Sequence, residues 1–159
     1  MAPSDAAPAP ALLSIGLHPQ RFDPLQALGS WQRELAETRG SGPAAESSFV
    51  GRVRDTTAEG RPLEALELEH YPGMTETQLE RLAREAAARH GALAVLVLHR
   101  VGRVEPGEAI VLMAVAADRR GPAQRCCQEL LEALKHEAPF WKREWSAGGG
   151  TWVMGNTAL

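Results

Sequence analysis

Residues 92–117, "ALAVLVLHRVGRVEPGEAIVLMAVAA", decide the fold, because they contain two apolar runs joined by a turn sequence. "ALAVLVLHRVGRV" (92–104) and "EAIVLMAVAA" (108–117) predict strands, and "EPGE" between them predicts a hairpin-like turn. Both runs are almost continuously apolar, which is typical of strands that are buried on both sides. The stretch therefore predicts a sheet that is covered on both faces.

Three amphipathic helices are predicted around this stretch. Apolar residues recur at helical spacing in "RFDPLQALGSWQRELAE" (21–37), "PGMTETQLERLAREAAARHG" (72–91) and "GPAQRCCQELLEALKHEAP" (121–139). In the second of these, Thr75 and Gln78 have the spacing of a capping box, which predicts where that helix begins.

Glycine and proline predict other helix ends. Gly91 is expected to stop the second helix. Pro122 suits the first position of the third helix, and Pro139 disfavours helical backbone at the residue before it. The third helix should therefore end near Glu137.

Four shorter segments read as further strands. These are "SSFVGRVRD" (47–55), "RPLEALELEHY" (61–71), "FWKREW" (140–145) and "TWVMG" (151–155), the last two around the glycine turn "SAGGG". The resulting order of helices and strands contains no repeating βαβ unit. We therefore predict an α+β fold with a mostly antiparallel sheet.

Length and composition limit the class of protein. The chain has 159 residues, of which 44% are hydrophobic, so residues 12–159 are expected to form one domain after an Ala/Pro-rich, disordered segment 1–11. The net charge of -3 predicts no binding to nucleic acid. No apolar run approaches the ~20 residues that span a bilayer, and the start lacks the pattern of a secretory signal. We expect a cytoplasmic protein.

Cysteine and histidine do not suggest a metal or disulfide site. Cys126 and Cys127 are adjacent on a predicted helix, where they point in different directions, so packing is their expected role. The five histidines are scattered without a metal-ligand spacing. We expect no metal and no cofactor.

"LKHEAPFWKREW" (134–145) has two interpretations. In the first, Lys135 complements the dipole at a helix end and Lys142 protects a solvated edge strand. In the second, Pro139 turns the chain back so that Lys135 and Lys142 converge. Two ammonium groups held close beside apolar rings lose protons more easily, so one would serve as an acid or nucleophile while the other binds an anion. Periodicity leaves both interpretations open.

Two arginine clusters allow the same pair of interpretations. Arg52 and Arg54 are two apart on a predicted strand, where they either solvate one face or bind a phosphate. Asp118, Arg119 and Arg120 lie where a strand gives way to a helix. That position suits an anion site, and it equally suits Asp118 as a helix cap.

Three long stretches resemble the large, catalytic subunit of molybdopterin synthase. They are residues 66–86, 97–124 and 130–145, and the similarity extends from about Ser48 to Val153. The motifs that carry it are "EHYPGM", "HRVG" followed by "PGE", and "KHEAPFWKRE".

The resemblance implies an α/β hammerhead fold with an added antiparallel sheet, and a homodimer within a heterotetramer. Each large subunit of this family binds a small ubiquitin-like sulfur carrier that ends in a Gly-Gly thiocarboxylate. Sulfur then passes twice to cyclic pyranopterin monophosphate, which gives the dithiolene of molybdopterin. Without a clear nucleophilic cysteine, this chain would need its sulfur from such a partner.

The resemblance also implies the site residues. Lys135 and Lys142 match the catalytic lysines of the family. The residues implied in substrate binding are Arg52, Val53, Arg54, Asp118, Arg119, Arg143 and Glu144.

Asp118 is the main departure from the family pattern, because a His–Arg pair there becomes Asp118–Arg119. A carboxylate opposes an anionic substrate. An alternative function is therefore a dimeric homologue that binds the carrier tail but has lost turnover. A generic phosphate-binding module is a third possibility, which the lack of a phosphate-loop pattern disfavours.

Overall fold

The computed structural model describes residues 7–40 and 42–153. Its elements in chain order are β1 (Leu12–His18), α1 (Pro24–Arg39), β2 (Ala45–Arg52), β3 (Ala65–His70), α2 (Met74–His90), β4 (Ala94–Arg100), β5 (Gly102–Val104), β6 (Ala109–Ala117), α3 (Arg120–Glu137), β7 (Phe140–Ser146) and β8 (Gly149–Trp152). These elements form an α+β fold with two separate sheets, which confirms the predicted fold class.

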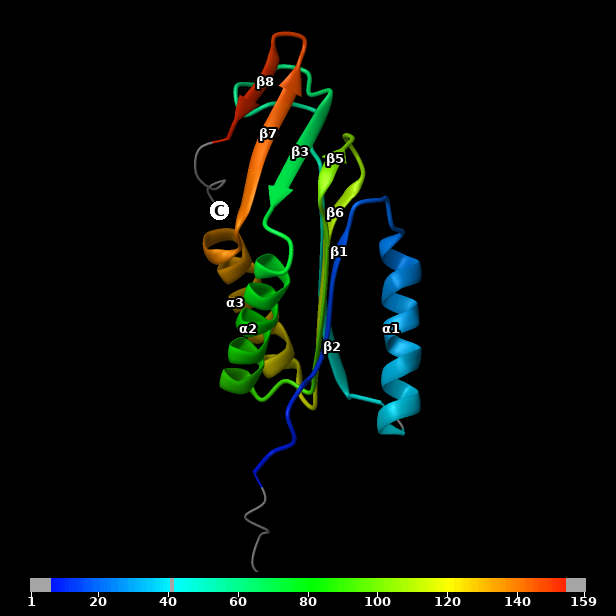
Figure 1. Cartoon of the computed structure of the whole chain (residues 1–159). Helices are drawn as coiled ribbons and strands as arrows, with labels where there is room; N and C mark the ends of the chain where they lie inside the picture. The colour runs from blue at the N-terminus through cyan, green and yellow to red at the C-terminus, as the bar shows by residue number, and fades with distance from the viewer. Residues whose placement is uncertain (1–6, 41, 154–159) are drawn as a thin grey trace, which may run out of the picture.

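The first sheet has the strand order β1-β4-β6-β2. β1 runs parallel to β4, whereas β4 pairs with β6 and β6 with β2 in antiparallel fashion. Helices α2 and α3 lie over one face of this sheet and α1 lies over the other (Figure 1). The central strands β4 and β6 are buried along almost their whole length, as their continuous apolarity predicts.

The second sheet has the order β5-β3-β7-β8 and is antiparallel throughout. It extends beyond the end of α3, at the top of Figure 1. Val53, Leu63, Leu68 and Val104 form its own small apolar core. Because only two residues separate the end of α3 from the start of β7, this sheet fixes the direction in which the chain leaves the helix.

The segment 92–104 is not the single strand that we predicted. It divides at Val101 into β4, in the first sheet, and β5, in the second. Gly102 has a φ of 78°, a left-handed conformation that glycine adopts without steric cost, so the chain can turn there. The predicted turn "EPGE" is present, since the amide of Glu108 donates to the carbonyl of Glu105 at 3.1 Å.

The first strand was missed by the sequence analysis. β1 lies directly after the segment predicted to be disordered, of which residues 1–6 fall outside the described residues and 7–11 form neither helix nor strand. The register pairs Leu12 with Ala94 and His18 with Arg100. A parallel pairing across more than 80 residues leaves no local signal in the sequence.

The helix starts also differ from prediction. The N-cap residue of α2 is Gly73, whose amide donates to the Glu76 carboxylate at 2.7 Å, so the predicted Thr75–Gln78 capping box is wrong. Thr75 is instead fully buried within the helix. Helix α3 begins at Arg120, two residues before Pro122, and so Pro122 is its third residue.

Candidate active site

Lys135 and Lys142 come together at the junction of α3 and β7. Lys135 lies in the last turn of α3, and Lys142 is the third residue of β7. Ala138 has extended backbone (φ -71°, ψ 132°), as expected for a residue before proline, and Pro139 then redirects the chain. The pKa of Lys142 is lowered, first by burial of its ammonium group and second by the nearby charge of Lys135. The structure therefore favours the converging arrangement of the two lysines over the solvated one.

His99 also belongs to this site, and the sequence analysis did not predict it as a site residue. Its ring stacks on Phe140, with 4.0 Å between the ring centroids and 13° between the planes. Burial lowers the pKa of His99 to about 4, and the charge of Lys142 contributes in the same direction. The available signal was a histidine directly after the apolar run 92–98. The site is thus built from α3, β7 and β4.

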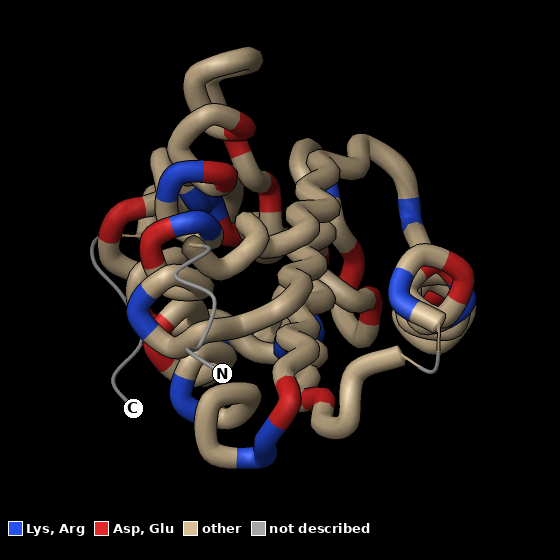
Figure 2. Tube along the Cα trace, turned by 90° about the horizontal axis from the view of Figure 1, so that it is seen from below, with Lys and Arg blue, Asp and Glu red and all other residues tan. Residues whose placement is uncertain are grey.

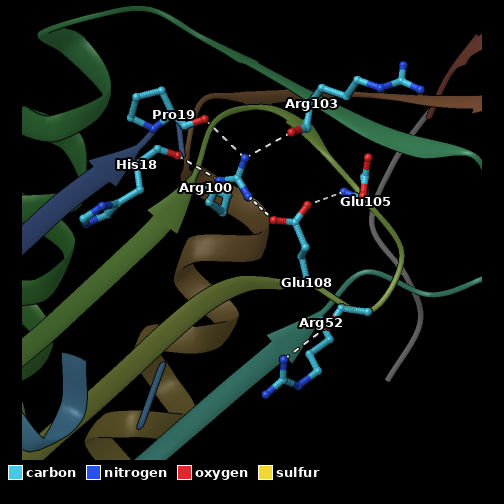
Figure 3. A network of polar contacts seen from close by, with 8 residues as sticks. His18, Pro19, Arg52, Arg100, Arg103, Glu105 and Glu108 are labelled. Atoms are coloured by element: carbon cyan, nitrogen blue, oxygen red, sulfur yellow. Dashed lines mark hydrogen bonds and ion pairs between the residues drawn. The ribbon is translucent and has the colours of Figure 1, made fainter. Parts of the chain in front are cut away.

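The motifs "HRVG" and "PGE" meet in a buried ion pair (Figure 3). The Arg100 Nη1 atom lies 2.8 Å from Glu108 Oε1. The rest of the guanidinium donates to three backbone carbonyls, those of His18, Pro19 and Arg103. The second carboxylate oxygen of Glu108 accepts from the Glu105 amide at 2.6 Å. This network joins the ends of β1 and β4 to β5 and to the 105–108 turn.

The predicted triplet Arg52, Val53 and Arg54 borders the same turn. β2 ends at Arg52 after a bulge, three residues earlier than we predicted. Val53 is buried and exchanges two backbone hydrogen bonds with the turn, while Arg52 donates to the carbonyl of Gly107 at 3.2 Å. Arg54 is exposed and makes no hydrogen bond or ion pair with any described residue. Arg54 is therefore the member of the triplet that is available to a ligand.

Arg143 and Glu144 lie on opposite faces of β7, because neighbouring strand residues alternate. Arg143 stands 3.8 Å from Glu67 and 3.9 Å from Glu69, and its guanidinium lies 4.0 Å from the centre of the Trp152 ring. This is the face that turns away from Lys142. Glu144 accepts a long hydrogen bond, 3.4 Å, from the amide of Ala58. The structure thus gives Arg143 partners within the second sheet and Glu144 a partner in the segment between β2 and β3.

Asp118 and Arg119 are not near the lysines of the same chain. They precede α3, whereas Lys135 lies in its last turn, so roughly 24 Å of helix separates Arg119 from Lys135 at 1.5 Å per residue. The residue that caps α3 is Arg119, and no side chain accepts a hydrogen bond there. The interpretation of Asp118 as a helix cap is therefore wrong, and its side chain is exposed.

The two cysteines are packing residues, as predicted. Both are buried in α3, and burial raises the pKa of Cys126 to about 12 and raises that of Cys127 as well. Both therefore remain thiols near neutral pH, which is the unreactive form. Within residues 7–40 and 42–153, no three His, Cys, Asp or Glu side chains gather closely enough to hold a metal ion.

The distribution of charged residues over the whole molecule does not reveal where the site lies. Basic and acidic positions interleave along the trace when the molecule is viewed as in Figure 2. The described helices include none that is long and apolar enough to cross a membrane. The fold and the site together define the class of this protein: it is an α+β protein with a local, partly buried pair of lysines.

Comparison with known proteins agrees with this description. The family model of the "MoaE protein" matches residues 26–137. A molybdopterin synthase catalytic subunit from Ralstonia nicotianae is 45% identical over 122 residues, which cover 76% of this chain and 69% of that one. Another molybdopterin synthase catalytic subunit, from Pseudomonas aeruginosa, is 41% identical over 143 residues, which cover 90% of this chain and 91% of that one.

Solved structures show the same fold. The molybdopterin biosynthesis MoaE protein from Burkholderia ambifaria superposes with a TM-score of 0.74 at 39% identity, covering 93% of each chain. A more distant match, with a TM-score of 0.70 at 23% identity over 90% of each chain, is a complex of subunits 1 and 2 of molybdopterin-converting factor from Helicobacter pylori. The chain belongs to the MoaE family, the catalytic subunits of molybdopterin synthase.

Proposed function

We propose that this chain transfers sulfur from a carrier subunit to cyclic pyranopterin monophosphate, the step of molybdenum cofactor biosynthesis that makes the dithiolene of molybdopterin. The observation that carries the proposal is the convergence of Lys135 and Lys142 in a partly buried site. A location in the cytoplasm is part of the same proposal.

The use of lysine in this chain supports a chemical role for the pair. The sequence contains 17 basic residues, and Lys135 and Lys142 are its only lysines; the other fifteen are arginines. Arginine supplies a permanent charge, but it does not lose its proton in proteins, whereas a buried lysine does. Lysine at these two positions and nowhere else fits a reaction that needs an amine.

The roles of the two lysines follow from their surroundings. Lys142 is the more readily deprotonated because its pKa is lowered by burial and by Lys135, so it suits proton transfer or nucleophilic attack. The Lys135 ammonium group, in the last turn of α3, suits an anion such as the thiocarboxylate of the carrier. Arg54 is exposed and free to meet the substrate phosphate.

The sulfur donor is a separate protein in this proposal. Cys126 and Cys127 are buried thiols inside α3 and do not line the lysine site. A small ubiquitin-like subunit with a C-terminal Gly-Gly thiocarboxylate is the expected partner. The Helicobacter pylori complex of two molybdopterin-converting factor subunits supports a two-subunit assembly.

A homodimer within a heterotetramer would account for Asp118 and Arg119. These residues lie at the far end of α3 from the lysines of their own chain, so a second copy would have to bring them to the site. The alternative function, a carrier-binding homologue without turnover, rests on Asp118, an exposed carboxylate where an anionic substrate is expected.

One reconstitution tests the proposal. The chain is mixed with thiocarboxylated carrier and cyclic pyranopterin monophosphate, and the dithiolene product is measured, with carrier lacking Gly-Gly as the control. We expect product only with the intact tail, and weaker binding without it. Binding of the intact carrier with no product would favour the homologue without turnover, and equal binding of both carriers would contradict insertion of the tail.

A further inference from the structure

His99 is buried between the first sheet and the lysine site. It is the second-last residue of β4, pairs with Leu17 on one side and Val111 on the other, and is 8% exposed. Residues two apart on a strand share a face, so His99 points to the same side as Val97, which packs beneath α2 and α3. Its side chain is therefore directed at the region where α3 gives way to β7.

The His99 ring is held in one orientation by two contacts. Its Nδ1 atom lies 2.7 Å from the carbonyl oxygen of Arg100, and since a carbonyl only accepts, Nδ1 carries the proton. The ring face stacks on Phe140 at 4.0 Å. Arg100 is itself fixed by the ion pair with Glu108, so the orientation of His99 is set by the network in Figure 3.

Phe140 connects this fixed ring to both lysines. It is the first residue of β7, its amide donates to the carbonyl of Ala138 at 2.9 Å, and it pairs with His70 of β3. Lys142 is two residues further on the same strand face. Lys135 is five residues earlier, in the last turn of α3. A shift of Phe140 would therefore move Lys142 relative to Lys135.

We propose that His99 is a positioning residue for Lys142: its ring packs against Phe140 and thereby keeps Lys142 beside Lys135. The inference rests on the proposed lysine chemistry. The imidazole of His99 is also compatible with two neighbouring lysines, because it stays neutral and adds no third positive charge.

The test compares three variants in the reconstituted complex. His99→Phe keeps a ring against Phe140, whereas His99→Asn keeps a donor near the Nδ1 position and loses the ring. His18→Asn is the control, because the Figure 3 network uses the backbone carbonyl of His18, which this substitution keeps. The His18 side chain contacts Phe22 (5.2 Å between ring centroids), which packs in the cluster beneath α1 on the other face of the sheet.

We expect His99→Asn to lower kcat by roughly 10- to 100-fold, the size of effect that a displacement of about 1 Å produces. His99→Phe should retain kcat within about threefold, and His18→Asn within about twofold. The KM for the pterin should change little. A folded His99→Asn variant with unchanged kcat would overturn the proposal, and so would an equal loss in His99→Phe, which would show that the imidazole itself is required.

A second measurement does not depend on turnover. Because the chain has only two lysines, ¹³C-labelled lysine gives two signals, which Lys135→Arg assigns. In His99→Asn the pKa of Lys142 should move back toward 10.5, and in His99→Phe it should stay where the wild type has it. An unchanged pKa of Lys142 in His99→Asn would contradict a positioning role.

Two further variants keep the proposal testable if His99→Asn does not fold. Phe140→Ala removes the other half of the stack, and it should reproduce the loss of kcat and the shift of Lys142. Retention of full kcat in Phe140→Ala would overturn the inference. Lys142→Ala separates the proposed lysine chemistry from the proposed role of His99. Normal turnover by Lys142→Ala would contradict the lysine chemistry. No turnover by Lys142→Ala together with normal turnover by His99→Asn would contradict only the role of His99.

Discussion

The Arg100–Glu108 pair and the Lys135–Lys142 pair are both shielded from solvent, but their electrostatic environments are opposite. Arg100 meets a carboxylate and three carbonyls, so its charge is compensated on every side. Lys142 is partly buried beside a second cation, and no described carboxylate pairs with it. A compensated charge stabilises a fold, whereas an uncompensated one costs stability and is typical of a functional site.

The largest effect is expected where the compensated pair is broken. Arg100→Ala leaves the Glu108 carboxylate buried without its partner and removes the link between both sheets. Loss of one partner of a buried pair costs about 3–5 kcal/mol, so we expect the free energy of unfolding to fall by that amount. Denaturant unfolding checks this, with Arg84→Ala, an exposed α2 residue, as the control. A loss below about 1 kcal/mol in Arg100→Ala would show that the network is not structural.

A slightly smaller effect is expected from His99 in acid. Its pKa in the folded state, about 4, lies below the ordinary histidine value of 6.5, so the unfolded chain binds the proton first. Stability from this group is complete above pH 6.5 and is lost as the pH falls toward 4, by about 3 kcal/mol at 1.36 kcal/mol for each pKa unit.

Unfolding free energies of wild type and His99→Phe between pH 7 and 4 isolate this contribution. The variant should lack the acid-dependent loss. Parallel curves for the two proteins would mean that His99 titrates normally in the fold.

Lys142→Met tests whether the Lys135–Lys142 pair, unlike the Arg100–Glu108 pair, costs stability. Replacing an uncompensated buried amine by an apolar side chain is expected to leave stability unchanged or raise it by about 1 kcal/mol at pH 7. The folded pKa of Lys142 is lowered, so wild type gains stability as the pH rises toward 10.5, and the advantage of the variant should shrink over that range. Thermal unfolding at pH 7 and 10 measures both. A strongly destabilised variant would indicate a structural lysine.

The smallest effect is expected at Asp118. It is exposed and does not cap α3, so Asp118→His should leave the melting temperature unchanged. Loss of one exposed negative charge near an anionic substrate should lower KM by about two- to fivefold, because solvent screens the repulsion. Glu80→Gln, an exposed change on α2, is the matched control. An unchanged KM would place Asp118 away from the substrate in the assembled enzyme.

The sequence was informative where structure is decided locally. The buried strands of 92–117 and the helix end before Pro139 depend on a few neighbouring residues. The convergence of Lys135 and Lys142 was one of two interpretations that the local pattern left open. The pairing of β1 with β4 and the contacts of Arg100 join segments far apart in the chain, so no local pattern reveals them. The cap interpretation of Asp118 failed because the N-cap position of α3 falls on the next residue, Arg119, and no side chain caps the helix there.

The central claim is that Lys135 and Lys142 act as amines and not merely as positive charges. Single-turnover sulfur transfer by Lys135→Arg and Lys142→Arg, each in complex with thiocarboxylated carrier, tests it most directly. Arginine keeps the charge but cannot lose its proton, so we expect carrier binding to be retained and the rate of at least the Lys142 variant to fall on the order of 100-fold or more. Wild-type rates in both arginine variants would contradict the account, since any permanent cation would then suffice at these positions.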